Sequence, residues 1–276
     1  MPLIAINREM GSLGMEAAKL LERELGIPVV YHEIIDHLAD KLRLRNSHVI
    51  RLLSGRLGLL ERLTADQTSL NIYTEDELLR SAGRGTILRG WGAVHLLRNV
   101  RHAVCVRICA PFETRLERMM ERLNTDDAEA VAREIRLSDE AQGAIVRRHF
   151  GLDWRDAEQY DLSLNTERLS VEQCAEKIMD CVRDPAFEET EESRAALDNL
   201  VLQAQVRAAL RADPRTRNLK VGIAADRGRV TLSGALERLE YPDFAVEVAR
   251  AVPGVRQVVN SFGMLDAEGS GARPAA

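Results

Sequence analysis

The stretch NREMGSLGMEAAKLL at residues 7–21 has the residue types that backbone phosphate binding requires. It places glycines and a serine between the apolar run LIAI, at residues 3–6, and a helix-forming segment. In a strand, glycine turn and helix start of this kind, the glycines let the backbone approach an anion and the first helical amides point at it. The stretch is therefore a candidate phosphate cradle.

The match of this stretch to the complete P-loop pattern is partial. GxxxxGK[ST] supplies a lysine for the β- and γ-phosphates and a hydroxyl for Mg²⁺. Here Glu9 replaces the first glycine, Met15 the lysine and Glu16 the hydroxyl residue, while the second glycine is kept. The residues placed to surround a phosphate are Arg8, Gly11, Ser12, Leu13, Gly14, Met15 and Glu16. Taken alone, the segment fits a phosphate loop and a tight structural turn equally well.

Composition and charge predict a cytoplasmic globular protein and disfavour membrane-spanning, nucleic-acid-binding and cysteine-metal proteins. The chain has 276 residues, 45% of them hydrophobic, which is enough for one large domain or two unequal ones. No apolar stretch reaches the roughly 18 to 20 residues of a membrane span, and the N-terminus lacks a secretory pattern, so we expect a cytoplasmic protein. The net charge of −5 disfavours nucleic acid as a partner. The four cysteines lack CxxC spacing, which predicts reduced thiols and no metal site.

Short apolar runs alternate with helical patterns over the first two thirds of the chain. The expected strands are LIAI (3–6), PVVY (28–31), TILRG (86–90), AVCVRICA (103–110) and LSLNT (162–166). This alternation predicts an α/β fold with a mostly parallel sheet covered by helices on both faces. The expected helix at 113–123 turns its leucines and methionines, including Leu123, toward the core and its arginines elsewhere.

A change in composition divides the chain. Residues 184–193 begin with Asp-Pro and contain DPAFEETEE, which has five acids and no base, so we interpret them as a linker. The linker separates a domain at 1–183 from a second domain at 194–266, and residues 267–276 are expected to form a flexible tail. The second domain has the pattern of a helix, a hairpin turning at Asp226-Arg227-Gly228, a helix and a strand.

Residues 3–36 and 86–183 together resemble the cytidylate kinase-like family, whose members have the nucleoside monophosphate kinase fold. The matching segments, in order, are INREMGSLGMEAAKLLERELGIPVVYHEII, ILRGWGA, APFETRLERMMER and HFGLDWRDAEQYDLSLNTERLSVEQCAEKI. The resemblance implies a P-loop kinase core that uses ATP and Mg²⁺. It also implies a site for a nucleoside monophosphate such as CMP over the sheet, and an arginine-bearing lid.

Several charged residues match positions that the family uses around phosphates. The resemblance implies catalytic roles for Arg115 and Arg118 after the fourth strand, and for Arg136 and Asp139 in the lid segment at 125–151. Guanidinium groups suit this role because they bind phosphate oxygens in pairs. Further nucleotide contacts are implied for Arg89, Trp91, Arg133, Arg147 and Arg148. The helical arginines could equally form a solvated face, and Trp91 could fill the core instead of stacking on a base.

Three positions depart from the family pattern. Met15 stands where family members commonly have arginine, Gly90-Trp91-Gly92-Ala93 replaces GRGA, and Glu140-Ala141-Gln142 replaces basic residues of the lid. Losing one such cation costs on the order of 10²- to 10³-fold in rate. Phosphoryl transfer is therefore expected to be slow or absent unless another cation substitutes. The cations available for this are Arg8, Lys19 and Arg89.

Residues 194–266 resemble the BON domain. The resemblance rests on the elements L..V..AL..DP, V.....GRVTLSG and A..V.GV..VVN, with Gly228 and Gly234 at its turn positions. It implies a small αββαβ domain that binds a phospholipid, a small ligand or another protein. No acid, base and nucleophile stand together in this segment, so we expect it to serve binding or assembly, including self-association, and not catalysis.

Two functions are consistent with these residues. The first is ATP-dependent phosphoryl transfer to a nucleoside monophosphate. The second is a catalytically impaired kinase fold that binds a nucleotide and signals through the BON domain or an oligomer. The family resemblance favours the first, and the missing cations favour the second.

Overall fold

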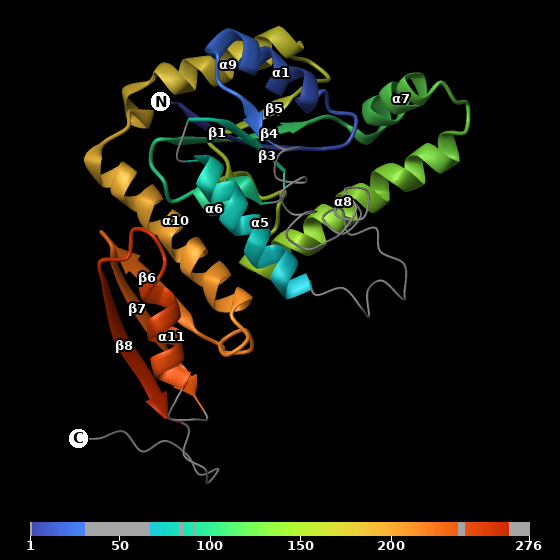
Figure 1. Ribbon diagram of the computed structural model, residues 1–276. Coiled ribbons are helices and arrows are strands. Elements are labelled where there is room, and N and C mark those ends of the chain that lie inside the picture. The colour runs from blue at the N-terminus through green and yellow to red at the C-terminus, as the bar shows by residue number, and fades with distance from the viewer. Residues whose placement is uncertain (1, 31–66, 83–84, 91, 237–240, 265–276) are drawn as a thin grey trace, which may run out of the picture. The chain divides into compact units, whose positions relative to one another are not determined.

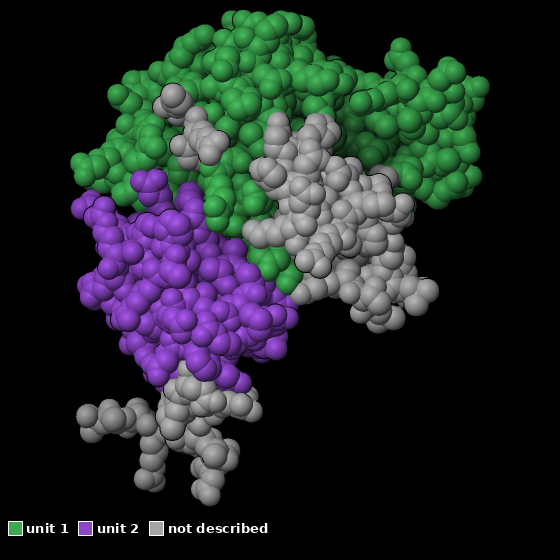
Figure 2. All heavy atoms as spheres, in the orientation of Figure 1, with its two compact units in different colours: residues 1–197 green, residues 198–276 purple. Residues whose placement is uncertain are grey.

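The chain forms two compact units, residues 1–197 and residues 198–276 (Figure 2). The computed structural model describes residues 2–30, 67–82, 85–90, 92–236 and 241–264. Among these residues no helix is both long enough and apolar enough to cross a membrane. The tail expected at 267–276 and much of the segment before the third strand lie outside the described residues.

A five-stranded sheet organises the first unit. Its strands are β1 (Leu3–Arg8), β2 (Val29–Val30), β3 (Ile87–Arg89), β4 (Ala103–Cys109) and β5 (Leu162–Asn165). They lie in the order β2-β3-β1-β4-β5, and every neighbouring pair is parallel. The predicted parallel sheet is confirmed. Because β1 is central, the chain that leaves its carboxyl end emerges in the middle of the sheet edge where α/β proteins bind ligands.

Helices cover both faces of this sheet, as predicted. Figure 1 shows α1 (Gly14–Leu25) and α9 (Val171–Arg183) on one face, with α5 (Gln67–Ala82) and α6 (Ala93–Leu97) on the other. Parallel strands buried on both faces are built from apolar runs, which accounts for the uninterrupted LIAI of β1.

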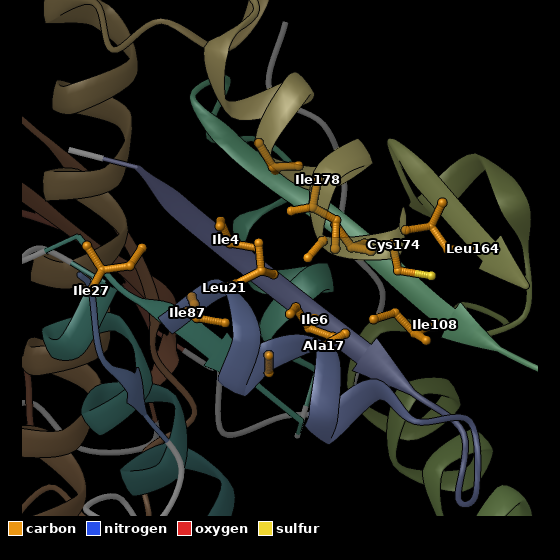
Figure 3. Close-up of a cluster of buried hydrophobic side chains, with 14 residues drawn as sticks. Ile4, Ile6, Ala17, Leu21, Ile27, Ile87, Ile108, Leu164, Cys174 and Ile178 are labelled. Carbon is orange, nitrogen blue, oxygen red and sulfur yellow. The ribbon is translucent and has the colours of Figure 1, made fainter. Parts of the chain in front are cut away.

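The core under α1 and α9 holds the start of α1 against the sheet. Ile4 and Ile6 of β1 are fully buried there against Leu21 of α1 and Ile178 of α9 (Figure 3). Each such aliphatic side chain contributes about 1.5–3 kcal/mol on burial. The α1 helix ends at Gly26, whose positive φ of 66° gives the left-handed C-cap. The loop between β1 and α1 is therefore anchored at both ends by packed elements.

Two helices follow β4 and extend from the sheet (Figure 1). They are α7 (Phe112–Leu123) and α8 (Ala128–Phe150), and a short 3₁₀ helix at Ala157–Gln159 precedes β5. The prediction for the sides of α7 was wrong at one leucine and at one arginine. Leu123 is 55% exposed, whereas Arg115 is only 4% exposed, because buried carboxylates neutralise this arginine and let it face inward.

The second unit has the predicted αββαβ order. Its elements are α10 (Glu191–Ala212), whose first seven residues belong to the first unit, β6 (Gly222–Asp226), β7 (Arg229–Leu236), α11 (Tyr241–Arg250) and β8 (Gln257–Met264). β6 and β7 form an antiparallel hairpin, whose turn residues Arg227 and Gly228 both have positive φ, and β8 pairs in parallel with β7. The segment expected as a linker, 184–193, contains a 3₁₀ helix at Pro185–Phe187 and the beginning of α10.

Candidate functional site

The loop that joins β1 to α1 is a tight turn with two left-handed residues. Gly11 has φ of 80°, and Leu13 has φ of 58°. The amide and hydroxyl of Ser12 both donate to the carbonyl oxygen of Glu9, at 3.2 and 2.8 Å, and Ser12 is fully buried. Because Leu13 stands at the N-cap, no side chain in the described part of the chain caps the first turn of α1. The first amides of α1 therefore lack a side-chain acceptor of the kind that usually satisfies them.

A pocket of about 460 Å³, here called pocket 1, opens beside this loop. It lies between the loop and α7, and its lining residues are Arg8, Gly11, Leu13, Gly14, Met15, Glu16, Arg118, Met119, Glu121 and Arg122. Six of the seven residues expected to surround a phosphate are among them; Ser12 instead holds the turn together from inside. Of the three cations that could replace the missing lysine, Arg8 lines pocket 1, whereas Lys19 and Arg89 do not.

Glycines let the loop pack against its neighbours. A Cβ at Gly11 would lie 2.9 Å from the carbonyl oxygen of Arg115, and a Cβ at Gly14 would lie 2.7 Å from Cβ of Arg8. Both distances are shorter than side-chain carbons tolerate. Gly11 therefore allows α7 to approach the loop, in addition to its conformational role.

Arg118 joins the loop to the end of β5 through one threonine. Its Nη1 donates to Oγ1 of Thr166 at 2.9 Å, and its Nη2 donates to the carbonyl oxygen of Thr166 at 2.7 Å. Thr166 Oγ1 in turn donates to the carbonyl oxygen of Ser12 at 3.0 Å. This chain of hydrogen bonds holds Arg118 at the wall of pocket 1.

A second pocket of about 660 Å³, here called pocket 2, is lined by Arg115, which does not line pocket 1. Five arginines and four acidic residues line it, together with four uncharged residues. The charged residues are Arg107, Arg115, Arg136, Arg147, Arg155, Glu9, Asp139, Glu140 and Asp153, and the uncharged ones are Ala110, Phe112, Gly143 and Trp154. The near balance of charge means that an anion would be held here by the arrangement of the arginines more than by a net field.

Arg115 and Asp139 form a buried, two-pronged ion pair. Nη1 and Nη2 of Arg115 donate to the two carboxylate oxygens of Asp139, at 3.1 and 2.9 Å, and Arg155 donates to the same carboxylate at 3.1 Å. Arg115 also lies 3.5 Å from the carboxylate of Glu9 and donates to the carbonyl oxygen of Met10 at 3.5 Å. Two of the four residues expected to be catalytic, Arg115 and Asp139, therefore contact each other, and the pair connects α8 to the loop.

The remaining expected contacts are spread over several environments. Arg136 and Arg147 line pocket 2, and the guanidinium of Arg136 lies 5.0 Å from the centre of the Phe112 ring. Arg133 is exposed and pairs with Glu129 at 3.6 Å, and Arg148 is exposed and lines neither pocket. Arg89 is buried at the end of β3, away from both pockets, and Trp91 lies outside the described residues.

Trp154, at the wall of pocket 2, contacts two guanidinium groups through its ring and the hydroxyl of Tyr160 through its backbone. The guanidinium groups of Arg107 and Arg155 lie 5.6 and 5.4 Å from its ring. The hydroxyl of Tyr160 donates to the backbone oxygen of Trp154 and accepts from the side-chain amide nitrogen Nδ2 of Asn7 at 2.8 Å. Burial raises the pKa of Tyr160 to about 12, so this hydroxyl remains protonated and keeps donating at neutral pH.

Comparison with known proteins identifies the family of the first unit. The model of the cytidylate kinase-like family matches residues 3–168, more than half of the chain. This chain belongs to the cytidylate kinase-like family. The BON domain model matches residues 198–264, so this cytidylate kinase-like protein carries the two modules in the predicted order.

Individual relatives are distant. A cytidylate kinase from Methanothermobacter thermautotrophicus is 27% identical over 176 residues, covering 62% of this chain and 98% of its own. A cytidylate kinase from Staphylothermus marinus is 28% identical over 114 residues, 41% of this chain and 63% of its own. The crystal structure of an uncharacterized protein from Eubacterium ventriosum aligns with a TM-score of 0.52 at 19% identity, over 66% of this chain and 98% of that one. This last likeness supports the fold alone.

Some residues of the site were not anticipated from the sequence of this cytidylate kinase-like protein. Thr166 fixes the loop and Arg118, while Arg107, Trp154 and Arg155 line pocket 2. A partial signal was available, since Trp154 and Thr166 lie inside the DW…YDLSLNT segment that carried much of the resemblance. Arg107 gave none, because an arginine in the middle of an apolar strand has no local reason to face a pocket.

Proposed function

We propose that this protein transfers a phosphoryl group from ATP to a nucleoside monophosphate such as CMP, at a low rate. The observation that carries the proposal is the uncapped glycine turn after the central strand β1, which opens on pocket 1 beside Arg8, Arg118 and Arg122. Backbone amides and guanidinium groups converging on one pocket are suited to the phosphates of a nucleotide. The names of the two relatives, both cytidylate kinases, support the choice of monophosphate.

The residues present are compatible with a magnesium–nucleotide complex. Mg²⁺ at such sites takes one or two carboxylates together with substrate phosphates, and pocket 1 is lined by the carboxylates of Glu16, in the first turn of α1, and Glu121, on α7. The described residues contain no cluster of three metal-binding side chains, so the nucleotide phosphates would supply most of the ligands. When bound, the ion would neutralise phosphate charge. The chain itself contributes the loop amides, which orient the phosphates, and Arg118, which Thr166 keeps at the pocket wall.

Met15 supports the low rate. Its side chain lines pocket 1 where the P-loop pattern has a lysine. We expect Met15→Arg to raise kcat by about 10²-fold, which is the rate change typically seen when one group that stabilises transition-state charge is removed or restored. Met119→Lys, which adds a cation to the same pocket from α7, is the matched control and should give less than a tenth of that gain.

A coupled assay with ATP, Mg²⁺ and a panel of nucleoside monophosphates tests this proposal, with calorimetry of the binding of ATP and of each monophosphate in parallel. Low turnover of CMP or dCMP that rises in Met15→Arg supports it. Binding of CMP without turnover in either protein supports instead a nucleotide-binding regulator, which the engagement of Arg115 by Asp139 favours. Failure to bind any monophosphate or ATP refutes both functions.

The BON domain at 198–264 is proposed to bind a small ligand, a phospholipid or a protein and to regulate or assemble the kinase-like unit. We keep the cytoplasm as the proposed location. Flotation with anionic vesicles separates the lipid alternative from the others, because a chain that does not float with them has no lipid ligand of that composition. Sedimentation with and without CMP then tests self-association.

A further inference from the structure

We propose that Glu9 is a positioning residue, whose buried carboxylate holds Arg107 and Arg115 in the orientation that binds the phosphate of a ligand in pocket 2. The proposal rests on the proposed function, from which we take the ligand of pocket 2 to be the nucleoside monophosphate, with pocket 1 left to the donor phosphates. Glu9 stands where the P-loop pattern has its first glycine. In the structure its carboxylate contacts two arginines that line pocket 2.

Glu9 is held by hydrogen bonds at its backbone amide, its backbone carbonyl and its side chain. Its amide donates to the carbonyl oxygen of Ile108 at 3.1 Å, and its carbonyl oxygen accepts from the amide and hydroxyl of Ser12. Its side chain is only 5% exposed, and Oε2 accepts from the amide of Ala110 at 3.3 Å. A carboxylate fixed in this way can impose an orientation on the groups it contacts.

The carboxylate contacts two arginines that come from different elements. Oε1 accepts from Nη2 of Arg107, on β4, at 2.7 Å, and Oε2 lies 3.5 Å from Nε of Arg115, on α7. Each guanidinium is also held at another edge, Arg107 by the carbonyl oxygen of Arg155 at 3.0 Å and Arg115 by Asp139. Without Glu9, Arg107 would keep only the carbonyl oxygen of Arg155 as a hydrogen-bond acceptor among the described residues. Arg115 would keep Asp139 and Met10 but lose the countercharge beside its Nε.

Positioning and simple electrostatics predict opposite effects of neutralising Glu9. Removing a negative charge from pocket 2 should strengthen the binding of an anion if charge alone matters. It should weaken that binding if the carboxylate aligns the arginines, because bidentate recognition of phosphate depends on geometry. Glu140 offers the matched control, because it lines pocket 2, is exposed, and forms no ion pair with another described residue.

The experiment measures CMP and cytidine binding by calorimetry in the full-length protein and in Glu9→Gln, Glu9→Asp and Glu140→Gln. We expect Glu9→Gln to weaken CMP binding about tenfold, the lower range for a hydrogen bond to a charged group, and to leave cytidine binding unchanged. Glu9→Asp keeps the charge but shortens its reach, so it should resemble Glu9→Gln; Glu140→Gln should bind CMP at least as tightly as wild type. If Glu9→Gln does not fold, Glu9→Asp carries the same comparison.

A second readout does not depend on the nucleotide. Phenylglyoxal modifies accessible arginines, and peptide mass spectrometry gives the rate at each one. Arg107 and Arg115 should react severalfold faster in Glu9→Gln, while Arg118, held by Thr166, is the internal control. Unchanged rates at Arg107 and Arg115, or CMP binding by Glu9→Gln as tight as in wild type, overturns the proposal. If wild type binds no monophosphate, the proposed function fails, and the modification rates still decide whether Glu9 positions these arginines.

Discussion

Replacing Gly11 with alanine should damage the loop far more than the same change at another left-handed glycine. At φ of 80° an alanine costs about 1–2 kcal/mol relative to a permitted conformation. Its Cβ would also lie 2.9 Å from the carbonyl oxygen of Arg115 and 3.1 Å from Cγ of Met119, and overpacking of this kind costs a further ~1–3 kcal/mol. The expected loss of unfolding free energy is therefore roughly 2–5 kcal/mol.

Gly26→Ala is the control for backbone strain alone. Gly26 has φ of 66°, and no atom would lie within 4 Å of its new Cβ, so only the first cost applies. Urea denaturation followed by tryptophan fluorescence reports on the unit at 1–197, because both tryptophans, Trp91 and Trp154, belong to it. Gly11→Ala should unfold about 1 M urea earlier than Gly26→Ala for a typical slope. Equal midpoints for the two variants would refute the close approach of α7 to the loop.

Three further predictions concern the same unit. Thr166→Val should cost about 1–3 kcal/mol in urea denaturation, because it removes the hydroxyl that accepts from Arg118 Nη1 and donates to the Ser12 carbonyl, while the backbone bond from Arg118 Nη2 stays; Thr114→Val, which removes only a 3.5 Å contact with Glu167, should cost less. Burial lowers the pKa of His95, so below about pH 6.5 the unfolded chain takes up a proton that the folded chain does not, and stability should fall as pH falls; His95→Phe should flatten this dependence relative to wild type. Burial raises the pKa of Cys105 to about 12, so this thiol should not react with a disulfide reagent at pH 8 until the protein is unfolded, as peptide mapping would show.

The features that the sequence predicted well are those with local causes. The strand runs, the glycine turn after β1 and the hairpin turn at Arg227 and Gly228 follow from apolar patterning and backbone preferences, and the structure contains them. The family resemblance then supplied the order of the two modules, which the family models match.

The arrangement of charges was less predictable because its causes are distant along the chain. Glu9 counted as a defect of the P-loop pattern, since its partner Arg107 lies 98 positions away. Helical periodicity predicted that the arginines of α7 face solvent. Arg115 is buried instead, because Asp139, 24 positions away in the chain, supplies its countercharge. These carboxylates and arginines come into contact only when the chain has folded, so no local sequence pattern predicts the pairs.

The shape of the loop does not depend on the side chain of Met15. Ser12 and Thr166 hold its backbone, and Gly11 fits it against α7, whereas Met15 faces pocket 1. The single methionine codon, ATG, is one nucleotide from a lysine codon and one from an arginine codon. A lineage with this scaffold can therefore lose or regain a phosphate-binding cation by a point mutation, with the core left as it is.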